Sequence, residues 1–230
     1  MRTREIVSGV WVAVGIEPAS RRTPFGVATT GPGRPDAAGP TSTGAVGLGA
    51  VTPADRLAAR GAPPWRARQI LAGRALLRAL LARVAPEAVD ARVVASGNGK
   101  PALVGWPRLG VSVSHDGGRL AVGVASGRRI GVDVQAPPDP VAEPLLRRCA
   151  APHLDRLAQL PRRQRDTAFA EIWTVQEACV KVDGSGIGGL PWTIDVPPDT
   201  DTGRWRGRRW QKVRGLTDLP VACAWDEEPR

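Results

Sequence analysis

One order of elements, an amphipathic helix followed by three short strands, occurs twice in this sequence. In residues 66–84, apolar side chains line one side of a helix and arginines line another, and a second long helical pattern spans residues 162–182 after a shorter one at 141–150. Three short apolar segments follow each long helix, at 111–115, 120–125 and 130–134, then at 192–196, 208–214 and 221–225. This order predicts an α+β fold of two similar halves, each a helix packed on a three-stranded antiparallel sheet, with a ligand cleft at their seam.

The remaining segments set the predicted domain boundaries. Residues 6–16 alternate as a strand does. Residues 17–50 are rich in Gly, Pro, Thr and Ser and hold too few large apolar side chains to offset the entropy of ordering, so a flexible segment is predicted. Thr52 is a predicted helix N-cap with Pro53 in the first turn. The predicted units are therefore an N-terminal strand in 1–16, the flexible segment 17–50, an N-terminal half 51–135 and a C-terminal half 136–230.

The composition limits the class of protein. The chain has 230 residues, of which 42% are hydrophobic, so it can bury a sizeable core. No apolar run reaches the roughly 20 residues that a membrane-spanning helix needs. The three cysteines lack CxxC spacing, which predicts neither a disulfide framework nor a zinc site and favours a cytoplasmic protein. A net charge of +10 favours a polyanionic partner: a nucleic acid, an anionic cofactor or an acidic protein.

The second long helix carries a polar stripe of Trp173, Glu177 and Lys181, because residues four apart on a helix are neighbours. In a functional interpretation, Glu177 is a metal ligand and general base, and Lys181 stabilises phosphate oxygens. In a structural interpretation, the two form a surface ion pair worth about 0.3–0.5 kcal/mol, and the spacing alone favours this one. Gly184 is the predicted residue that ends the helix.

Asp133 and Gln135 lie two residues apart at the end of a predicted strand and therefore share one face of it. A carboxylate and an amide oxygen are suitable ligands for Mg²⁺, which takes few protein ligands and keeps several waters. A half-buried strand with a polar outer face explains the same residues, and by themselves they favour that explanation.

Ser114 and His115 end another predicted strand, and Asp116 begins the Gly-rich turn that follows. They cannot form a Ser-His-Asp relay with one another, because successive strand residues face opposite ways. Turn amides and an imidazole can converge on one phosphate, although a satisfied structural histidine fits equally well. A lysine, Lys100, is presented by the turn at 98–101.

The segment 204–210 interleaves arginine with tryptophan. Nucleic-acid-binding patches show this pattern. The alternation also fits an edge strand with one solvated face, and we favour the edge strand.

Taken together, four ordered motifs resemble the Sfp-type 4′-phosphopantetheinyl transferases. They are a GKP turn at 99–101, an SxSH strand end at 112–115, a GxD strand at 131–133, and WxxxExxxK at 173–181 followed by a Gly-rich turn at 184–186. Residues 64–78 also resemble the helix that precedes these motifs in the family. The resemblance spans residues 52–190, and the combination of motifs is more specific than any one of them.

The resemblance implies the pseudo-twofold fold of that family, formed by a monomer, and a magnesium-dependent reaction of the holo-[acyl-carrier-protein] synthase type. In this reaction the 4′-phosphopantetheine arm of coenzyme A passes to a serine hydroxyl of an apo acyl or peptidyl carrier protein, and 3′,5′-ADP leaves. Such carriers serve fatty acid, polyketide and nonribosomal peptide synthesis. The expected partners are thus coenzyme A and a carrier protein, without nucleic acid or membrane.

The resemblance also implies roles for single residues. Asp133 and Glu177, with Gln135, would hold Mg²⁺, and Glu177 would take the proton of the carrier serine. Lys181 would stabilise the leaving diphosphate. The residues implied to contact coenzyme A are Lys100, Ser114, His115, Lys181 and, near the nucleotide, Arg68.

Two positions depart from the family pattern. Gln135 stands where the family often has Glu, and Gln176 stands where it commonly has Lys. A catalytically silent homologue that only binds coenzyme A or a carrier protein is therefore one alternative, and a basic nucleic-acid-binding protein is another.

Overall fold

The computed structural model describes residues 1–18 and 50–229, so the predicted flexible segment 17–50 lies almost wholly outside the described residues. The strands are β1 (Arg2–Val7), β2 (Val10–Ile16), β3 (Val93–Ala95), β4 (Pro101–Leu103), β5 (Leu109–Asp116), β6 (Arg119–Ser126), β7 (Ile130–Val134), β8 (Thr202–Trp205), β9 (Arg208–Lys212) and β10 (Val221–Asp226). The α-helices are α1 (Pro53–Ala58), α2 (Pro64–Val84), α3 (Glu143–Cys149), α4 (Leu154–Ala158) and α5 (Arg162–Lys181). Short 3₁₀ turns are η2 (Pro86–Ala88), η3 (Ala151–His153), η4 (Gly186–Gly189) and η5 (Pro191–Thr193).

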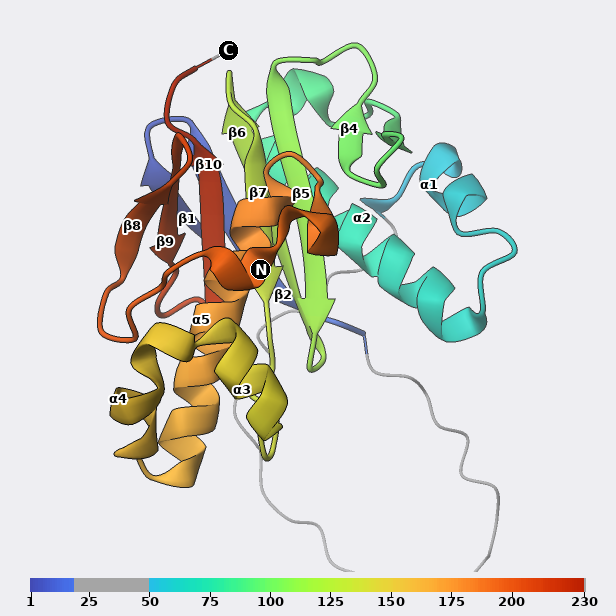
Figure 1. Ribbon diagram of the computed structural model, residues 1–230. Helices are drawn as coiled ribbons and strands as arrows, with labels where there is room; N and C mark the ends of the chain where they lie inside the picture. The colour runs from blue at the N-terminus through green and yellow to red at the C-terminus, as the bar shows by residue number, and fades with distance from the viewer. Residues whose placement is uncertain (19–49, 230) are drawn as a thin grey trace, which may run out of the picture.

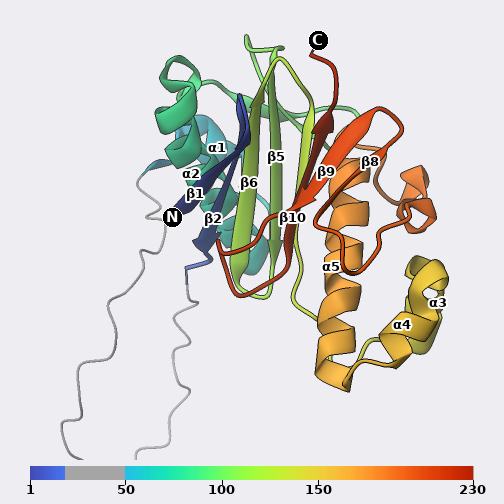
Figure 2. The same cartoon turned by 90° about the vertical axis from the view of Figure 1, so that its left-hand side faces the viewer.

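The strands form two antiparallel sheets and a small hairpin. The first sheet has the order β1-β2-β6-β5 and the second the order β7-β10-β9-β8, while β3 pairs with β4. Figures 1 and 2 show the two sheets beside each other, with α2 covering the first and α5 the second. The predicted α+β class with antiparallel sheets is confirmed. Each sheet has four strands rather than the predicted three.

Buried apolar side chains fill three layers of the described structure. Leucines of α2 pack on the first sheet around Val122 and Val124. The two sheets pack on each other through valines such as Val12 and Val132. The inner face of α5 packs on the second sheet through residues at helical spacing, as the sequence predicts: Phe169, Ile172, Val175 and Cys179. No helix in the described part of the chain is long and apolar enough to cross a lipid bilayer.

The prediction that residues 130–134 pair with the two preceding strands in one three-stranded sheet is wrong. β7 pairs in register with β10 of the second sheet, from Ile130 opposite Trp225 to Val134 opposite Val221. The reason is that β6 is already paired on both edges, by β2 and β5. The chain that leaves β6 therefore cannot pair with β6; it pairs with β10 instead and brings Asp133 to the boundary between the two sheets.

Two other strand predictions need correction. Residues 6–16 do not form one strand, because Gly9, with a φ of 75°, turns the chain between β1 and β2. Residues 192–196 are not a strand: the first two belong to the 3₁₀ turn η5 and the others follow it, and the strand lies instead at β8. Prolines 191, 197 and 198 bracket this stretch and cannot donate to a strand ladder.

The start of α1 is as predicted. The Thr52 hydroxyl oxygen caps α1 by accepting a hydrogen bond from the Asp55 amide. The Asp55 carboxylate in turn accepts a hydrogen bond from the Thr52 amide. Arg78, one of the arginines on the basic side of α2, is buried and binds Asp55 through Nε at 2.5 Å and Nη2 at 3.0 Å. This pair fixes α1 against α2.

The Arg-Trp segment forms the β8–β9 hairpin, turned at Arg206 and Gly207, both with positive φ. As favoured from the sequence, β8 is an edge strand. Trp210 is only 3% exposed and packs in the core under α5, and Trp205 packs against the same cluster. The buried Trp210 ring is thus not free to stack on a base, which weakens the nucleic-acid interpretation.

Candidate active site

The site lies where β5 of the first sheet runs beside β7 of the second. No backbone ladder pairs these strands in the described structure; serine hydroxyls of β5 join them instead. Ser112 Oγ accepts from the Val132 amide at 2.9 Å, and Ser114 Oγ accepts from the Val134 amide at 3.4 Å. The two serines of the SxSH motif therefore satisfy β7 amides that no neighbouring strand reaches, and they fix the register of β7 on β5.

Asp133 is the centre of the site. Its side chain is 6% exposed, and Oδ1 accepts from Ser114 Oγ at 2.7 Å and from Lys181 Nζ at 2.5 Å. Lys181 Nζ also lies 3.2 Å from Ser114 Oγ. The interpretation of Asp133 as a polar outer-face residue is therefore wrong, and the ion pair of Lys181 is with Asp133 across the fold rather than with Glu177 on the helix surface.

The glycine of the GxD motif allows this approach. A Cβ on Gly131 would lie 2.0 Å from the Ala178 carbonyl oxygen and 2.9 Å from the Lys181 Cβ. Both contacts are with α5, so the helix sits directly on the β7 backbone at this point. Only glycine leaves room for α5 to bring Lys181 and Glu177 over Asp133.

The electrostatics of the two carboxyl groups are coupled. Burial raises the pKa of Asp133, and the nearby Lys181 ammonium and the Ser114 hydroxyl oppose that rise. Burial also raises the pKa of Glu177, which Lys181 lowers and the Asp133 charge raises further. At both carboxyl groups burial outweighs the effect of the Lys181 ammonium, so both pKa values stay raised.

The donor set fits a divalent cation. Asp133 Oδ2 and Glu177 Oε1 are buried, and neither has a hydrogen-bond partner in the described structure. Such atoms are costly to leave unpaired, and hard carboxylate oxygens are the preferred ligands of Mg²⁺. No cluster of three His, Cys, Asp or Glu side chains in the described ranges could hold a metal, so an ion here would rest on these two carboxylates with amide or water oxygens.

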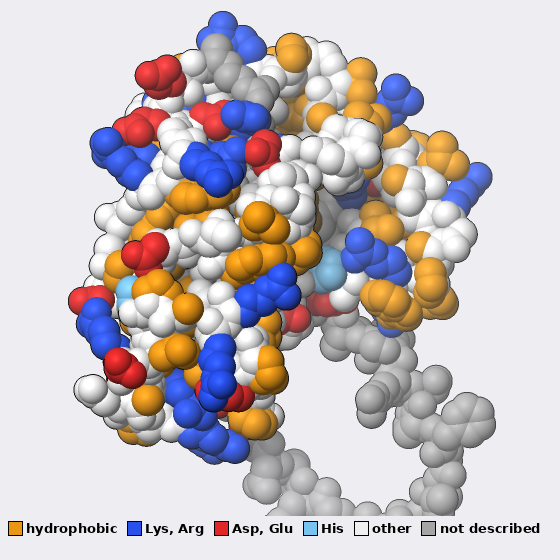
Figure 3. Space-filling model, viewed as in Figure 1, with side chains coloured by type: hydrophobic (Ala, Val, Ile, Leu, Met, Phe, Trp, Pro, Cys, Tyr) orange, Lys and Arg blue, Asp and Glu red, His pale blue; other side chains and the backbone are white. Residues whose placement is uncertain are grey.

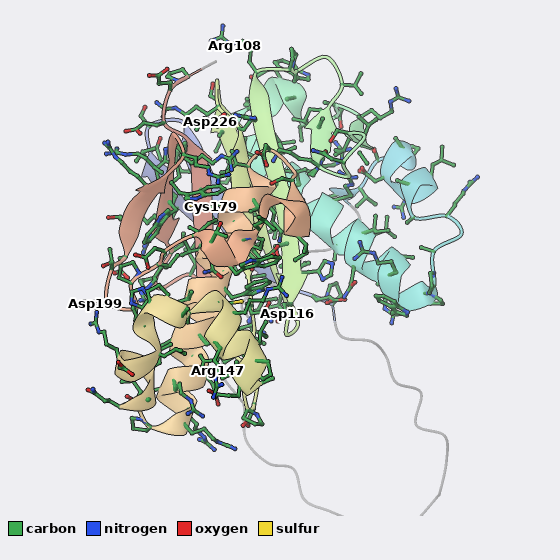
Figure 4. The ribbon with its side chains drawn as sticks, viewed as in Figure 1. Arg108, Asp116, Arg147, Cys179, Asp199 and Asp226 are labelled. Carbon is green, nitrogen blue, oxygen red and sulfur yellow. The ribbon has the colours of Figure 1, made fainter. Side chains whose placement is uncertain are left out.

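Gln135 lies at the end of β7 and is held by Asp116. Its Nε2 donates to Asp116 Oδ2 at 2.9 Å, and the same oxygen accepts from the Ala136 amide at 2.6 Å. Figure 4 labels Asp116, near the end of β5. The Nε2 atom of Gln135 donates to the Ala136 carbonyl as well, at 3.2 Å. The sequence argues against Asp116 as part of a Ser-His-Asp relay, but it does not indicate that Asp116 orients Gln135.

His115 faces a different pocket, between α2, β5 and the β3–β4 hairpin, with a volume of about 200 Å³. Arg66 Nη1 lies 2.7 Å from His115 Nε2. A guanidinium only donates, so this imidazole nitrogen must accept and the ring is neutral. In agreement, burial lowers the pKa of His115, and the charge of Arg66 lowers it further.

In Figure 3 a hollow separates the part of the molecule around α2 from the part around α5.

The cations of that pocket come from one stripe of α2. Arg66 and Arg74 both line it, and Arg74 Nη1 is buried with no partner in the described structure. Arg68, the residue named from the resemblance, is not among the lining residues. The spacing of 66, 70 and 74, four residues apart, places these positions on one helix face and could have identified both arginines.

Lys100 belongs to the β3–β4 turn, but its ammonium group is bound away from the pocket of His115. Its Nζ donates at 2.6 Å to two backbone carbonyls, those of Ile130 and Lys181. Its neighbours Gly99 and Pro101 line the pocket of His115, but Lys100 itself does not.

Gln176 does not face the site. It is fully buried, and its Nε2 donates to the Cys149 carbonyl at 2.8 Å and the Ile194 carbonyl at 2.9 Å. It therefore ties the ends of α3 and η5 to α5, on a different side of the helix from Lys181. The loss of a basic residue at this position removes no charge that points at Asp133.

Two comparisons with known proteins bear on this site. The profile of the 4′-phosphopantetheinyl transferase superfamily matches residues 129–223. A Synechocystis sp. protein provisionally described as a 4′-phosphopantetheinyl transferase is 34% identical over 122 residues, which cover 47% of this chain and 50% of the relative. The match thus spans about half the length of that relative. The predicted resemblance is confirmed at the level of the superfamily, and only over residues 129–223, which are similar to the 4′-phosphopantetheinyl transferase superfamily.

Proposed function

We propose that this protein is an Sfp-type phosphopantetheinyl transferase, which moves the 4′-phosphopantetheine arm of coenzyme A to a serine of an apo carrier protein and releases 3′,5′-ADP. The observation that carries the proposal is the convergence of Asp133, Glu177 and Lys181, with two buried carboxylate oxygens left unpaired. The comparisons support the family, and the geometry of these residues supports the reaction.

Asp133, Glu177 and Gln135 would hold Mg²⁺, which when bound neutralises charge on the pyrophosphate of coenzyme A. Ser114 and Lys181 hold the Asp133 carboxylate by Oδ1 and leave Oδ2 for the cation. Lys181 is the cation beside both carboxylates, so it also supplies positive charge where negative charge develops on the leaving 3′,5′-ADP.

In the transfer step, the carrier serine oxygen forms a bond to the phosphorus of the pantetheine phosphate. The bond between that phosphorus and the oxygen of 3′,5′-ADP breaks. The serine proton passes to Glu177, directly or through one water. A raised pKa suits this role, because a general base works best when its pKa lies near the working pH.

The phosphates of coenzyme A would enter the pocket of His115. Arg66 and Arg74 from α2 provide two guanidinium groups there, and fixed guanidinium groups bind phosphate oxygens well. Ser114 contributes by holding Asp133 and β7. Arg68 is proposed as a weaker contact at the outer part of the nucleotide.

Partner and compartment follow from the same reasoning. The net charge of +10 suits polyanionic coenzyme A and an acidic carrier protein. Residues of both predicted halves, from β5, β7 and α5, build one site, so we propose that a monomer is sufficient. The three cysteines are buried free thiols, which suits the reducing cytoplasm.

The test is mass spectrometry of apo carriers after incubation with the protein, coenzyme A and Mg²⁺. Fatty-acid, polyketide and nonribosomal peptide carriers should be compared. A mass gain of one phosphopantetheine on at least one carrier is expected, and it should vanish with Glu177→Gln while the fold persists. Absence of the adduct on all three classes, with coenzyme A binding retained, would instead favour the silent homologue, the alternative that Gln135 in place of a carboxylate raises.

A further inference from the structure

The β3–β4 turn grips the C-terminal end of α5. Asn98 Nδ2 donates to the Asp183 carbonyl at 2.7 Å, and Lys100 Nζ donates to the Lys181 carbonyl at 2.6 Å. The last carbonyls of a helix have no partner within the helix, and a cation is favourable at that end of the helix dipole. The turn therefore supplies donors that α5 cannot supply for itself.

The same lysine also holds β7. Its second bond is to the carbonyl of Ile130, the first residue of β7 and three residues before Asp133. Lys100 thus bridges the end of α5, which carries Glu177 and Lys181, and the start of β7, which carries Asp133. The Lys100 ammonium group therefore binds both α5 and β7, the two elements whose relative position determines the geometry of the site.

The turn is built to hold that position. Ser96 Oγ donates to Asn98 Oδ1 at 2.6 Å, and the Ser96 amide donates to the Lys100 carbonyl at 2.8 Å. The segment that follows α5 passes close to Asn98: a Cβ on Gly184 would lie only 2.5 Å from Asn98 Nδ2. Gly184 has a φ of 78°, and the Gly184 and Ser185 amides both donate to the Val180 carbonyl as the helix ends.

We propose that Lys100 is a positioning residue, which sets α5 against β7 and so places Lys181 and Glu177 over Asp133, rather than a ligand of coenzyme A phosphate. This proposal rests on the proposed function for its kinetic readout. Two of the three donors of the Lys100 ammonium are committed to carbonyls at 2.6 Å, and Lys100 does not line the pocket that holds Arg66, Arg74 and His115. Asn98, which is uncharged, shares the task.

The kinetic test compares Lys100→Met with Arg66→Met. If Lys100 positions the site, Lys100→Met lowers kcat by about 10- to 100-fold, because a small misplacement of reacting groups is costly, and the KM for coenzyme A changes less than about threefold. Arg66→Met should show the opposite pattern. A rise of about tenfold or more in the KM of Lys100→Met for coenzyme A, with kcat unchanged, overturns the proposal.

A second variant, Asn98→Ala, keeps the proposal testable if Lys100→Met fails to fold. It removes a donor to α5 without removing charge, so it should lower kcat in the same direction and leave the KM for coenzyme A unchanged. Gly97→Ala is the matched control in the same turn, since nothing lies within 4 Å of a Cβ there. An Asn98→Ala enzyme as fast as Gly97→Ala would contradict the proposal.

Hydrogen exchange provides a readout that does not need activity. The amides of Gly184 and Ser185 should exchange at least about tenfold faster in Lys100→Met and Asn98→Ala than in the wild type, and at the wild-type rate in Gly97→Ala. If the wild type modifies no carrier, the proposed function fails and exchange still decides whether Lys100 fixes this end of α5. Unchanged exchange in both variants would overturn the positioning role.

Discussion

Lys181 Nζ lies 2.5 Å from Asp133 Oδ1, although the two residues are 48 positions apart in the sequence. The contact joins α5 to β7 and so fixes the helix that carries Glu177 against the strand that carries Asp133. Lys181 is 29% exposed and Asp133 only 6%, so the carboxylate depends on this cation more than the cation depends on it. The pair gives the site both its geometry and its charge.

Lys181→Met tests that dependence. Removing the ammonium leaves a buried carboxylate without its cation, so the free energy of unfolding should fall by about 1–3 kcal/mol. Phosphopantetheine transfer should fall at least about 100-fold. In urea unfolding, the double variant Asp133→Asn with Lys181→Met should regain part of the lost stability and none of the activity. A double variant less stable than Lys181→Met alone would contradict the proposed coupling.

Glu177 gives a pH dependence with a defined sign. In the metal-free protein the pKa of Glu177 is raised, so protons compete with Mg²⁺ for this carboxylate, and kcat/KM at limiting Mg²⁺ should fall as the pH is lowered. A raised folded pKa also means that the stability contribution of Glu177 is complete below its unfolded pKa and is lost as pH rises through the folded pKa.

Glu177→Gln removes that titration. At pH 7 without added metal, the variant should therefore unfold at a higher temperature than the wild type while losing transfer activity. At pH 4 the difference in melting temperature should largely vanish. Calorimetry at the two pH values checks this, and a variant less stable than the wild type at pH 7 would contradict it.

The pocket of His115 predicts which arginine of α2 matters most. Arg66→Met should raise the KM for coenzyme A by about tenfold with a small effect on kcat, because Arg66 contacts His115 and lines the pocket. The rise should be larger than that caused by Arg68→Met. Arg83→Met, near the end of the helix and outside the pocket, serves as the control. Steady-state kinetics with varied coenzyme A measures these KM values. A larger rise in KM for Arg68→Met than for Arg66→Met would contradict the prediction.

Gly131→Ala tests the close approach of α5 to β7. The new Cβ would meet the Ala178 carbonyl at 2.0 Å, and this backbone atom cannot move without shifting the helix. We expect a loss of about 3 kcal/mol or more in the free energy of unfolding. Gly97→Ala, which meets nothing within 4 Å, should change it by less than about 1 kcal/mol. Similar denaturation midpoints for the two variants would show that α5 does not rest on Gly131 as described.

Much of the fold could be read from local patterns. The spacing of apolar side chains in α2 and α5, and the cap at Thr52, act within a few residues, so sequence alone predicts them. Strand partners are not local. The place of β7 in the second sheet depended on β6 already having two neighbours, which no property of residues 130–134 reveals. The prolines at 191, 197 and 198 are a local signal against a strand at 192–196, since proline cannot donate to a strand ladder.

The sequence by itself determined which residue types the site has and which of them share a helix face or strand face. Glu177 with Lys181, and Asp133 with Gln135, follow from the periods of helix and strand. Only the tertiary structure decided how these pairs meet: Lys181 turns to Asp133, Gln176 turns into the core, and Lys100 binds carbonyls of α5 and β7. The physical reason is that periodicity fixes directions around one element, whereas partners depend on how closely two elements approach, and here Gly131 sets that distance.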